Sequence, residues 1–123
     1  MLTRERIEAL IAMCEQGKFI DAIEEFYDDG ATMQENGGPL RIGKAALIEN
    51  ERRVLRSIKE IRVNRANSFL VDGNRAAINW IYEFIDEEGY TFRRNEIAYQ
   101  RWQNGQIVEE RFYYDPAETV RLS

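Results

Sequence analysis

Four long β-strand patterns joined by short turns are the feature of this sequence that most limits how the chain can fold. They lie at about 60–71, 75–85, 90–102 and 106–114, and the hairpin signals Asp72-Gly73-Asn74, Asp86-Glu87-Glu88-Gly89 and Asn104-Gly105 separate them. Each stretch is longer than a usual strand of about five or six residues, which favours a strongly curved sheet wrapped around helices. Pro116 marks where strand pairing stops.

The N-terminal part has helical spacing instead. Thr3 can cap a helix whose apolar positions run from Ile7 to Cys14, and Gly17 ends it. A second helix is expected from Phe19 to about Tyr27, and Asp28-Asp29-Gly30 breaks it before a β-like stretch over 31–35.

The clearest loop, Gly37-Gly38-Pro39, precedes a third helix expected at about Lys44–Ser57. We therefore predict an α+β fold in which three N-terminal helices pack on a strongly curved antiparallel sheet. A length of 123 residues gives room for a single domain over 1–123.

Composition excludes several classes of protein. Hydrophobic residues at 44% and charged residues at 32% are typical of a globular chain, and the net charge of −5 is spread along the sequence, which argues against nucleic-acid binding. No apolar run approaches the roughly 18 residues that span a membrane. The charged, amphipathic N-terminus predicts neither signal peptide nor anchor, so a cytoplasmic location is expected by default.

Both faces of the strand 75–85 are apolar. One alternating set contains Ala76, Ile78, Trp80, Tyr82 and Phe84, and the other contains Ala77, Asn79, Ile81, Glu83 and Ile85. Two apolar faces need two coverings, which predicts helices on one side and a second copy on the other, in a homodimer through the sheet faces. The alternative is that Trp80 and Tyr82 form the helix-packed core and the other set is solvated.

The order of elements resembles the cone-shaped, cystatin-like fold of SnoaL-like polyketide cyclases, ketosteroid isomerases and limonene epoxide hydrolases, in the nuclear-transport-factor-2-like superfamily. The segment Phe26-Tyr27-Asp28-Asp29-Gly30-Ala31-Thr32 is similar to the passage from helix to strand in that family. The ending Asn104-Gly105-Gln106-Ile107-Val108 through Tyr113-Tyr114-Asp115 is similar to its last strand. The resemblance covers the whole chain and implies a cone that binds a small apolar molecule.

Most catalytic positions of these families do not carry over. The general base of the isomerases falls near Glu35, but their oxyanion-binding tyrosine falls near Leu10 and their protonated acid near Ala98. The aspartate–arginine–aspartate trio of the epoxide hydrolases falls near Phe112, Asn79 and Ile81, and their water-binding tyrosine and asparagine fall near Met33 and Glu35. The chain is therefore expected to be neither a conventional ketosteroid isomerase nor an epoxide hydrolase of that kind.

Without histidine, acid–base work falls to a carboxylate, tyrosine or lysine. Glu35 is the candidate catalytic base for a cyclase or isomerase reaction, because burial in an apolar cone would raise its pKa. Hydrogen-bond donors for an enolate are expected among Asn79, Tyr27 and Trp102. The expected substrate-binding residues are Tyr27, Met33, Glu51, Asn79, Ile81, Trp102, Glu110, Phe112 and Tyr114.

Several alternatives stay open at this point. Glu51 interrupts an apolar helix face and either enters the pocket or lies at its edge, and strand register decides whether Glu109 or Glu110 enters the cone. The arginines at 93, 94 and 101 either bind an anion or pair across the sheet with residues such as Glu83 and Glu109. No metal or cofactor is expected, and Cys14 is interpreted as a core thiol. The alternative function is a non-catalytic dimeric binding or interaction domain.

Overall fold

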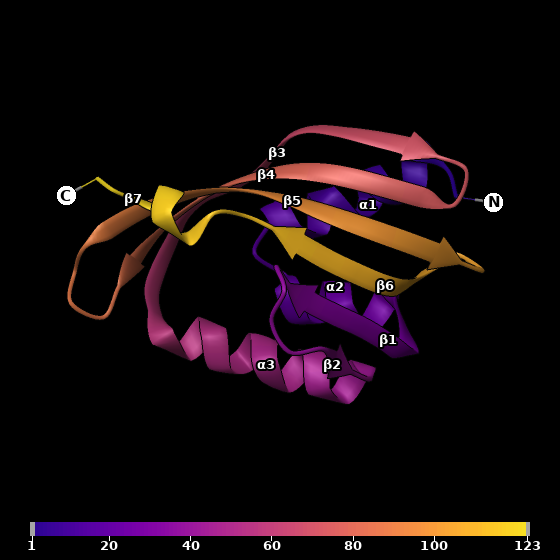
Figure 1. Cartoon of the computed structure of the whole chain (residues 1–123), viewed down its shortest axis with the longest axis horizontal. Helices are drawn as coiled ribbons and strands as arrows, with labels where there is room; N and C mark the ends of the chain where they lie inside the picture. The colour runs from indigo at the N-terminus through magenta and orange to yellow at the C-terminus, as the bar shows by residue number, and fades with distance from the viewer. Residues whose placement is uncertain (1, 123) are drawn as a thin grey trace.

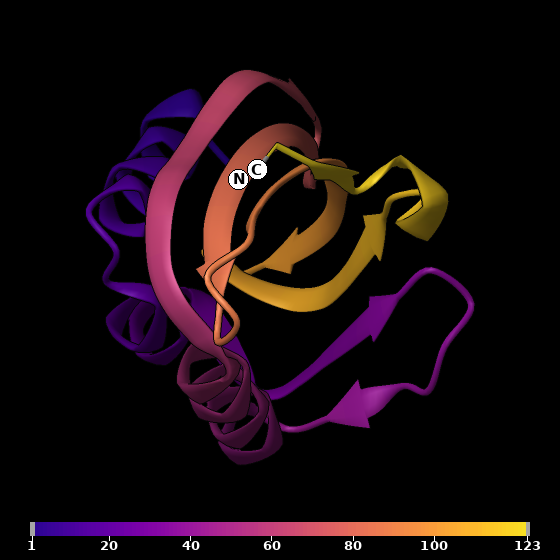
Figure 2. The same cartoon turned by 90° about the vertical axis from the view of Figure 1, so that its left-hand side faces the viewer.

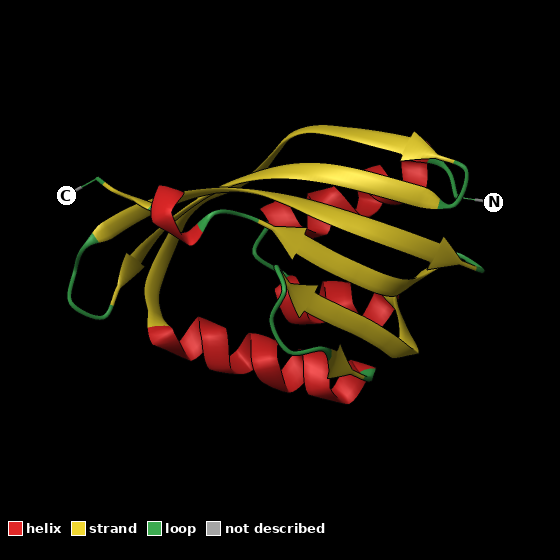
Figure 3. Cartoon of the chain, in the orientation of Figure 1, coloured by secondary structure: helices red, strands yellow, loops and turns green. Residues whose placement is uncertain are grey.

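A layer of helices covers one face of a single curled sheet in the computed structural model, which describes residues 2–122 (Figures 1 and 3). Two helices begin the chain, α1 (Arg4–Glu15) and α2 (Phe19–Phe26), and α3 (Lys44–Ser57) follows the first two strands. The strands are β1 (Tyr27–Glu35), β2 (Arg41–Ile42), β3 (Ile58–Asp72), β4 (Arg75–Asp86), β5 (Thr91–Gln103), β6 (Gln106–Tyr113) and β7 (Val120–Arg121). A short 3-10 helix, Pro116–Glu118, precedes β7.

The sheet is mixed, which corrects the prediction of an antiparallel sheet. Within residues 2–122 its seven strands follow the order β2-β1-β6-β5-β4-β3, with β7 paired to β5. The predicted hairpins join β3 to β6 in antiparallel pairs, but β1 pairs with β6 in parallel. A parallel pair needs a long crossover, and here α3 and the four strands β2, β3, β4 and β5 separate β1 from β6 in the chain.

The helix ends follow the predicted signals closely. The Thr3 side chain accepts a hydrogen bond from the Arg6 backbone nitrogen at 3.2 Å, and Gly17 takes a left-handed φ of +80° just after α1. The expected break at Asp28-Asp29-Gly30 lies instead inside β1, where pairing with β6 is irregular between Tyr27 and Thr32. The strand thus begins directly after α2.

The core lies between the helices and the concave face of the sheet, whose curl is seen in Figure 2. On β4 the buried set is Ala76, Ile78 and Trp80, so the set that begins at Ala76 faces the helices. Phe26 of α2 packs edge-on against Trp102 of β5, with ring centroids 6.4 Å apart. Burying side chains of this size contributes roughly 1.5–3 kcal/mol each, which fixes the helix layer on the sheet.

The other face of the sheet carries exposed apolar side chains and ion pairs. Leu70, Ile97, Tyr99 and Tyr113 are between 39% and 74% exposed. Arg93 pairs with Glu83 at 3.5 Å and Arg101 with Glu109 at 3.3 Å, which confirms the cross-strand interpretation of those two arginines. No described helix is long and apolar enough to cross a membrane.

Candidate functional site

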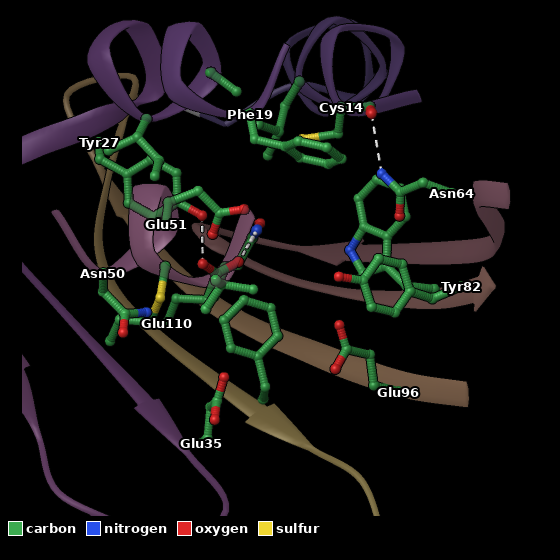
Figure 4. Close-up of a pocket in the computed structure, with 18 of the residues that line it drawn as sticks. Cys14, Phe19, Tyr27, Glu35, Asn50, Glu51, Asn64, Tyr82, Glu96 and Glu110 are labelled. Carbon is green, nitrogen blue, oxygen red and sulfur yellow. Dashed lines mark hydrogen bonds between the residues drawn. The ribbon is translucent and has the colours of Figure 1, made fainter. Parts of the chain in front are cut away.

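A cavity of about 160 Å³ lies between the three helices and the concave face of the sheet (Figure 4). All three helices contribute to its wall, together with β1, β3, β4, β5 and β6. A cavity of about 150 Å³ accommodates a molecule of the size of benzene. The space therefore fits one ring with a small substituent.

Glu110 is the most deeply buried acid of the cavity wall, with 4% of its surface exposed. The Tyr27 hydroxyl donates a hydrogen bond to its Oε1, and Gln100 Nε2 donates to its Oε2 at 2.7 Å (Figure 4). Trp102 Nε1 donates to Gln100 Oε1 at 3.0 Å, so the amide nitrogen of Gln100 must face Glu110. Three side chains thus hold one carboxylate in a defined orientation.

An extra residue in β6 explains why this glutamate points inward. β5 and β6 pair Trp102 with Ile107 but Arg101 with Glu109, so Val108 is an added residue in the ladder. Strict alternation would have placed Ile107 on the same face as Glu109, whereas Ile107 and Glu110 are both buried and Glu109 is exposed. Of the two registers that the sequence left open, the one with Glu110 inward is observed.

Burial raises the pKa of Glu110 to about 7, with a further rise from the nearby Glu51 charge, although the hydrogen bonds from Gln100 and Tyr27 act to lower it. Burial also raises the pKa of Tyr27 well above its usual value, so its hydroxyl keeps its proton. A carboxyl with a pKa near neutrality can both take up and release a proton near neutral pH. The buried dyad therefore has the properties of an acid–base group.

Two further carboxylates enter the cavity without protein partners. Glu51 of α3 and Glu96 of β5 line it, and neither makes a hydrogen bond or salt bridge with any residue in 2–122 (Figure 4). Burial raises the pKa of Glu96 to about 7 against the lowering effect of Arg94, and burial followed by the Glu35 charge raises that of Glu51. Glu51 therefore belongs to the pocket and is not paired with an arginine.

Glu35, the predicted base, lines the cavity at the end of β1 and is half-buried. Its Oε2 accepts a hydrogen bond from the Tyr114 hydroxyl at 3.4 Å. The Arg94 guanidinium lies 4.3 Å from the centre of the Tyr114 ring and also lines the cavity. Glu35 is thus present at the site, in a wetter position than Glu110.

The structure brings six of the predicted site residues to the cavity and leaves four outside its wall. Those at the cavity are Tyr27, Met33, Glu35, Glu51, Glu110 and Phe112. Asn79 and Ile81 lie on the outer face, where Asn79 donates to Asn95 and to the Glu96 carbonyl oxygen. Trp102 is packed in the core, and Tyr114 lies outside the wall and contacts two lining residues, Glu35 and Arg94.

Cys14 lines the cavity as well as packing on the core. Burial, with smaller effects from neighbouring carboxylates, raises its pKa to about 12, so it stays a thiol. This behaviour agrees with the interpretation of Cys14 as a core thiol and gives no nucleophile.

Two polar side chains of β5, Glu96 and Gln100, were not among the expected site residues, and Arg94 was expected either to bind an anion or to pair across the sheet. Arg94, Glu96 and Gln100 all line the cavity, and each lies an even number of residues from Trp102. Because side chains two apart share a face, the expectation that Trp102 points inward already implied the same for these three. From helix α3, Asn50 also lines the cavity and gave no sequence signal beyond its position next to Glu51.

No group of three or more histidine, cysteine, aspartate or glutamate side chains in residues 2–122 is arranged to hold a metal ion. The four cavity carboxylates come from four different elements and line its wall separately. Their arrangement suits an organic ligand that spans the space between them.

Comparison with known proteins places this geometry in a family. The profile described as the SnoaL-like domain matches residues 7–110. Among solved structures, a candidate SnoaL-like polyketide cyclase from Mesorhizobium loti is 24% identical with a TM-score of 0.79, over 93% of this chain and 100% of that one. No curated protein matched the sequence.

Two more distant structures share the fold. An NTF2-like protein of unknown function from Burkholderia pseudomallei has a TM-score of 0.81 at 16% identity, over 93% of this chain and 91% of that one. A protein with a ketosteroid isomerase-like fold from Catenulispora acidiphila, solved in complex with trimethylamine, has a TM-score of 0.80 at 16% identity, over 96% and 91% of the two chains.

Proposed function

Because the chain belongs to the SnoaL-like domain family, we propose that it binds a small, largely apolar organic molecule in its cone and that Glu110 moves a proton on that molecule. The observation that carries the proposal is a completely buried, hydrogen-bonded carboxylate on the wall of an open cavity. That the Catenulispora acidiphila protein was solved with trimethylamine supports a small ligand for this fold.

The reaction class that fits is removal of a proton next to a carbonyl group, followed by its return elsewhere, as in cyclisation or isomerisation. The Glu110 carboxylate takes the proton, and the electrons of the broken C–H bond move to the carbonyl oxygen as an enolate. Tyr27 and Trp102, two expected enolate donors, already donate to Glu110 and Gln100. The Tyr82 hydroxyl, which lines the cavity and whose pKa burial raises, is a better-placed donor.

Glu35 remains the competing candidate for the base, as the sequence predicted. It reaches the same cavity, and its neighbour Tyr114 donates to it. Glu110 is preferred for two reasons. Burial raises its pKa to about 7, and two hydrogen-bond donors, Tyr27 and Gln100, hold its carboxylate in one orientation.

The test is deuterium exchange next to the carbonyl of cyclohexanone in D2O, followed by NMR with wild type, Glu110→Gln, Glu35→Gln and Glu109→Gln. General acid–base groups contribute about 10²- to 10⁴-fold, so Glu110→Gln should lose at least about a hundredfold in exchange rate. Glu109→Gln changes an exposed carboxylate on the opposite face and should exchange like wild type. If Glu35→Gln lost exchange activity and Glu110→Gln kept it, the general base would be Glu35 and not Glu110.

A second copy on the outer sheet face is also part of the proposal. Leu70, Ile97, Tyr99 and Tyr113 give that face an exposed apolar character that a partner sheet would cover. If wild-type protein gave no exchange above the uncatalysed rate, the non-catalytic dimeric binding domain would be the better description.

A further inference from the structure

The cavity wall carries more negative than positive charge. Four carboxyl groups line it: those of Glu35, Glu51, Glu96 and Glu110. Arg94 is the one cationic side chain among the described lining residues, and no salt bridge joins it to these acids. Its guanidinium stacks on Tyr114, and its Nε donates to Thr119 Oγ1 at 3.4 Å, both outside the lining.

Three polar side chains of the cavity wall have atoms with no hydrogen-bond partner in residues 2–122. Glu51 and Glu96 make no hydrogen bond or ion pair with any part of the chain that the structure describes. Asn50, only 7% exposed, accepts a hydrogen bond from Arg53 on its oxygen, but its side-chain nitrogen has no partner in residues 2–122. Glu51 and Glu96 are half-buried, and the unpartnered atoms of all three residues are open to the cavity and not sealed off. A ligand that enters the cavity can therefore reach them and supply partners.

Aromatic rings make up much of the remaining surface. The rings at the cavity are those of Phe19, Tyr27, Trp80, Tyr82 and Phe112. The negative faces of such rings attract cations, and several rings around one space are the usual means of binding ammonium groups. Carboxylates that lack counter-ions and an aromatic wall therefore favour the same kind of ligand.

We propose that the ligand of this cavity is a small organic amine, with one positive charge on a compact apolar body, whose ammonium group is held by Glu51 and Glu96 and by the aromatic wall. The inference rests on the proposed function, because it names the class of molecule that the cone takes. The raised pKa values of Glu51 and Glu96 agree with it, since burial and like charges disfavour their ionised forms and a bound cation would reverse that effect.

The test compares three probes of nearly equal size at about pH 8: benzylamine (cationic), benzyl alcohol (neutral) and benzoate (anionic). Binding is measured by isothermal titration calorimetry. A charge-assisted contact in a desolvated site should give benzylamine about ten- to a hundredfold tighter binding than benzyl alcohol. Benzoate should bind more weakly than either, because the wall would repel it.

Three variants separate charge from shape. Glu51→Gln and Glu96→Gln keep the side-chain volume but remove a negative charge, so each should reduce the preference for benzylamine over benzyl alcohol by about tenfold or more. Glu109→Gln, on the opposite face, should keep the wild-type preference.

The outcomes distinguish this inference from the proposed function. Benzyl alcohol or benzoate binding as tightly as benzylamine would overturn the amine ligand while leaving a cavity that takes small molecules. A benzylamine preference unchanged in both glutamine variants would overturn the assignment to Glu51 and Glu96. If none of the probes bound, the proposed function itself would fail, and the inference with it.

Discussion

Glu110 should make the folded protein less stable as the pH rises, and removing its charge should abolish that effect. The ordinary pKa of a glutamate, 4.5 here, rises to about 7 in the folded chain, mainly through burial. A group whose pKa is raised on folding contributes stability that is complete below its unfolded pKa and is lost as pH rises through its folded pKa. The loss therefore falls between about pH 4.5 and pH 7.

The size of the effect follows from the two pKa values. Each unit is worth about 1.4 kcal/mol, so the rise from 4.5 to about 7 corresponds to about 3 kcal/mol in full. Most of that, about 2–3 kcal/mol, is lost between about pH 5 and pH 8. Over the same pH interval, Glu110→Gln should lose correspondingly less free energy of unfolding.

Urea unfolding of wild type and Glu110→Gln, followed by tryptophan fluorescence from about pH 5 to pH 8, gives the free energy of unfolding for each. Glu51 and Glu96 contribute to the slope in both proteins, so the difference between the two curves gives the contribution of Glu110 together with its coupling to these two charges. Glu109→Gln is the control, because that side chain is exposed and pairs with Arg101 on the outer face. A Glu110→Gln curve as steep as that of wild type would refute the assignment of a raised pKa to this carboxyl.

Two other perturbations test the remaining parts of the site and surface. Trp102→Phe removes the donor that orients the Gln100 amide, so Gln100 can turn its oxygen toward Glu110 and raise its pKa further. The pH midpoint of cyclohexanone exchange should then move up by about one unit. An unchanged midpoint would show that the orientation of the Gln100 amide does not set the pKa of Glu110. Tyr99→Lys places a charge on the exposed apolar sheet face and should convert a dimer to a monomer by light scattering coupled to gel filtration. Wild-type protein that is itself monomeric would contradict that proposal.

Local patterns were sufficient to predict most elements of this fold. The third helix was expected at about Lys44–Ser57 and has those bounds, because its apolar spacing and the preceding loop are both local signals. The parallel pairing of β1 with β6 was not predictable in the same way. No local pattern specifies which strand lies beside β1, since that depends on how the whole chain from α3 to β5 turns back.

Positions carried over from distant relatives gave the inner face on β6 and the wrong face on β4. Phe112 lines the cavity, and so does Glu110, whose register the sequence had left open, but Asn79 and Ile81 lie on the outer face. Their neighbours Trp80 and Tyr82 line the cavity instead. A shift of one residue exchanges the two faces of a strand, so a comparison between distant sequences easily makes this error.

The bulge at Val108 shows the limit of the rule that side chains alternate between the two faces of a strand. It lets Ile107 fill the core and Glu110 enter the cavity, although the two are three positions apart and regular alternation would place them on opposite faces. Nothing in the run Gln106–Tyr113 marks an extra residue, because valine is an ordinary strand residue. Only the pairing partners in β5 reveal it.

The cavity carboxylates cannot be explained by the needs of folding. Glu110 alone costs about 3 kcal/mol when ionised, from the pKa of about 7 and the ordinary 4.5, and an apolar side chain of similar volume would avoid that cost. Glu96 has a pKa of about 7 for the same reason, and it lacks even the hydrogen bonds that partly compensate Glu110. A net stability of about 5–15 kcal/mol leaves little room for such groups unless they act on a ligand. The chemistry of the cavity, rather than the architecture around it, therefore accounts for why these acids are there.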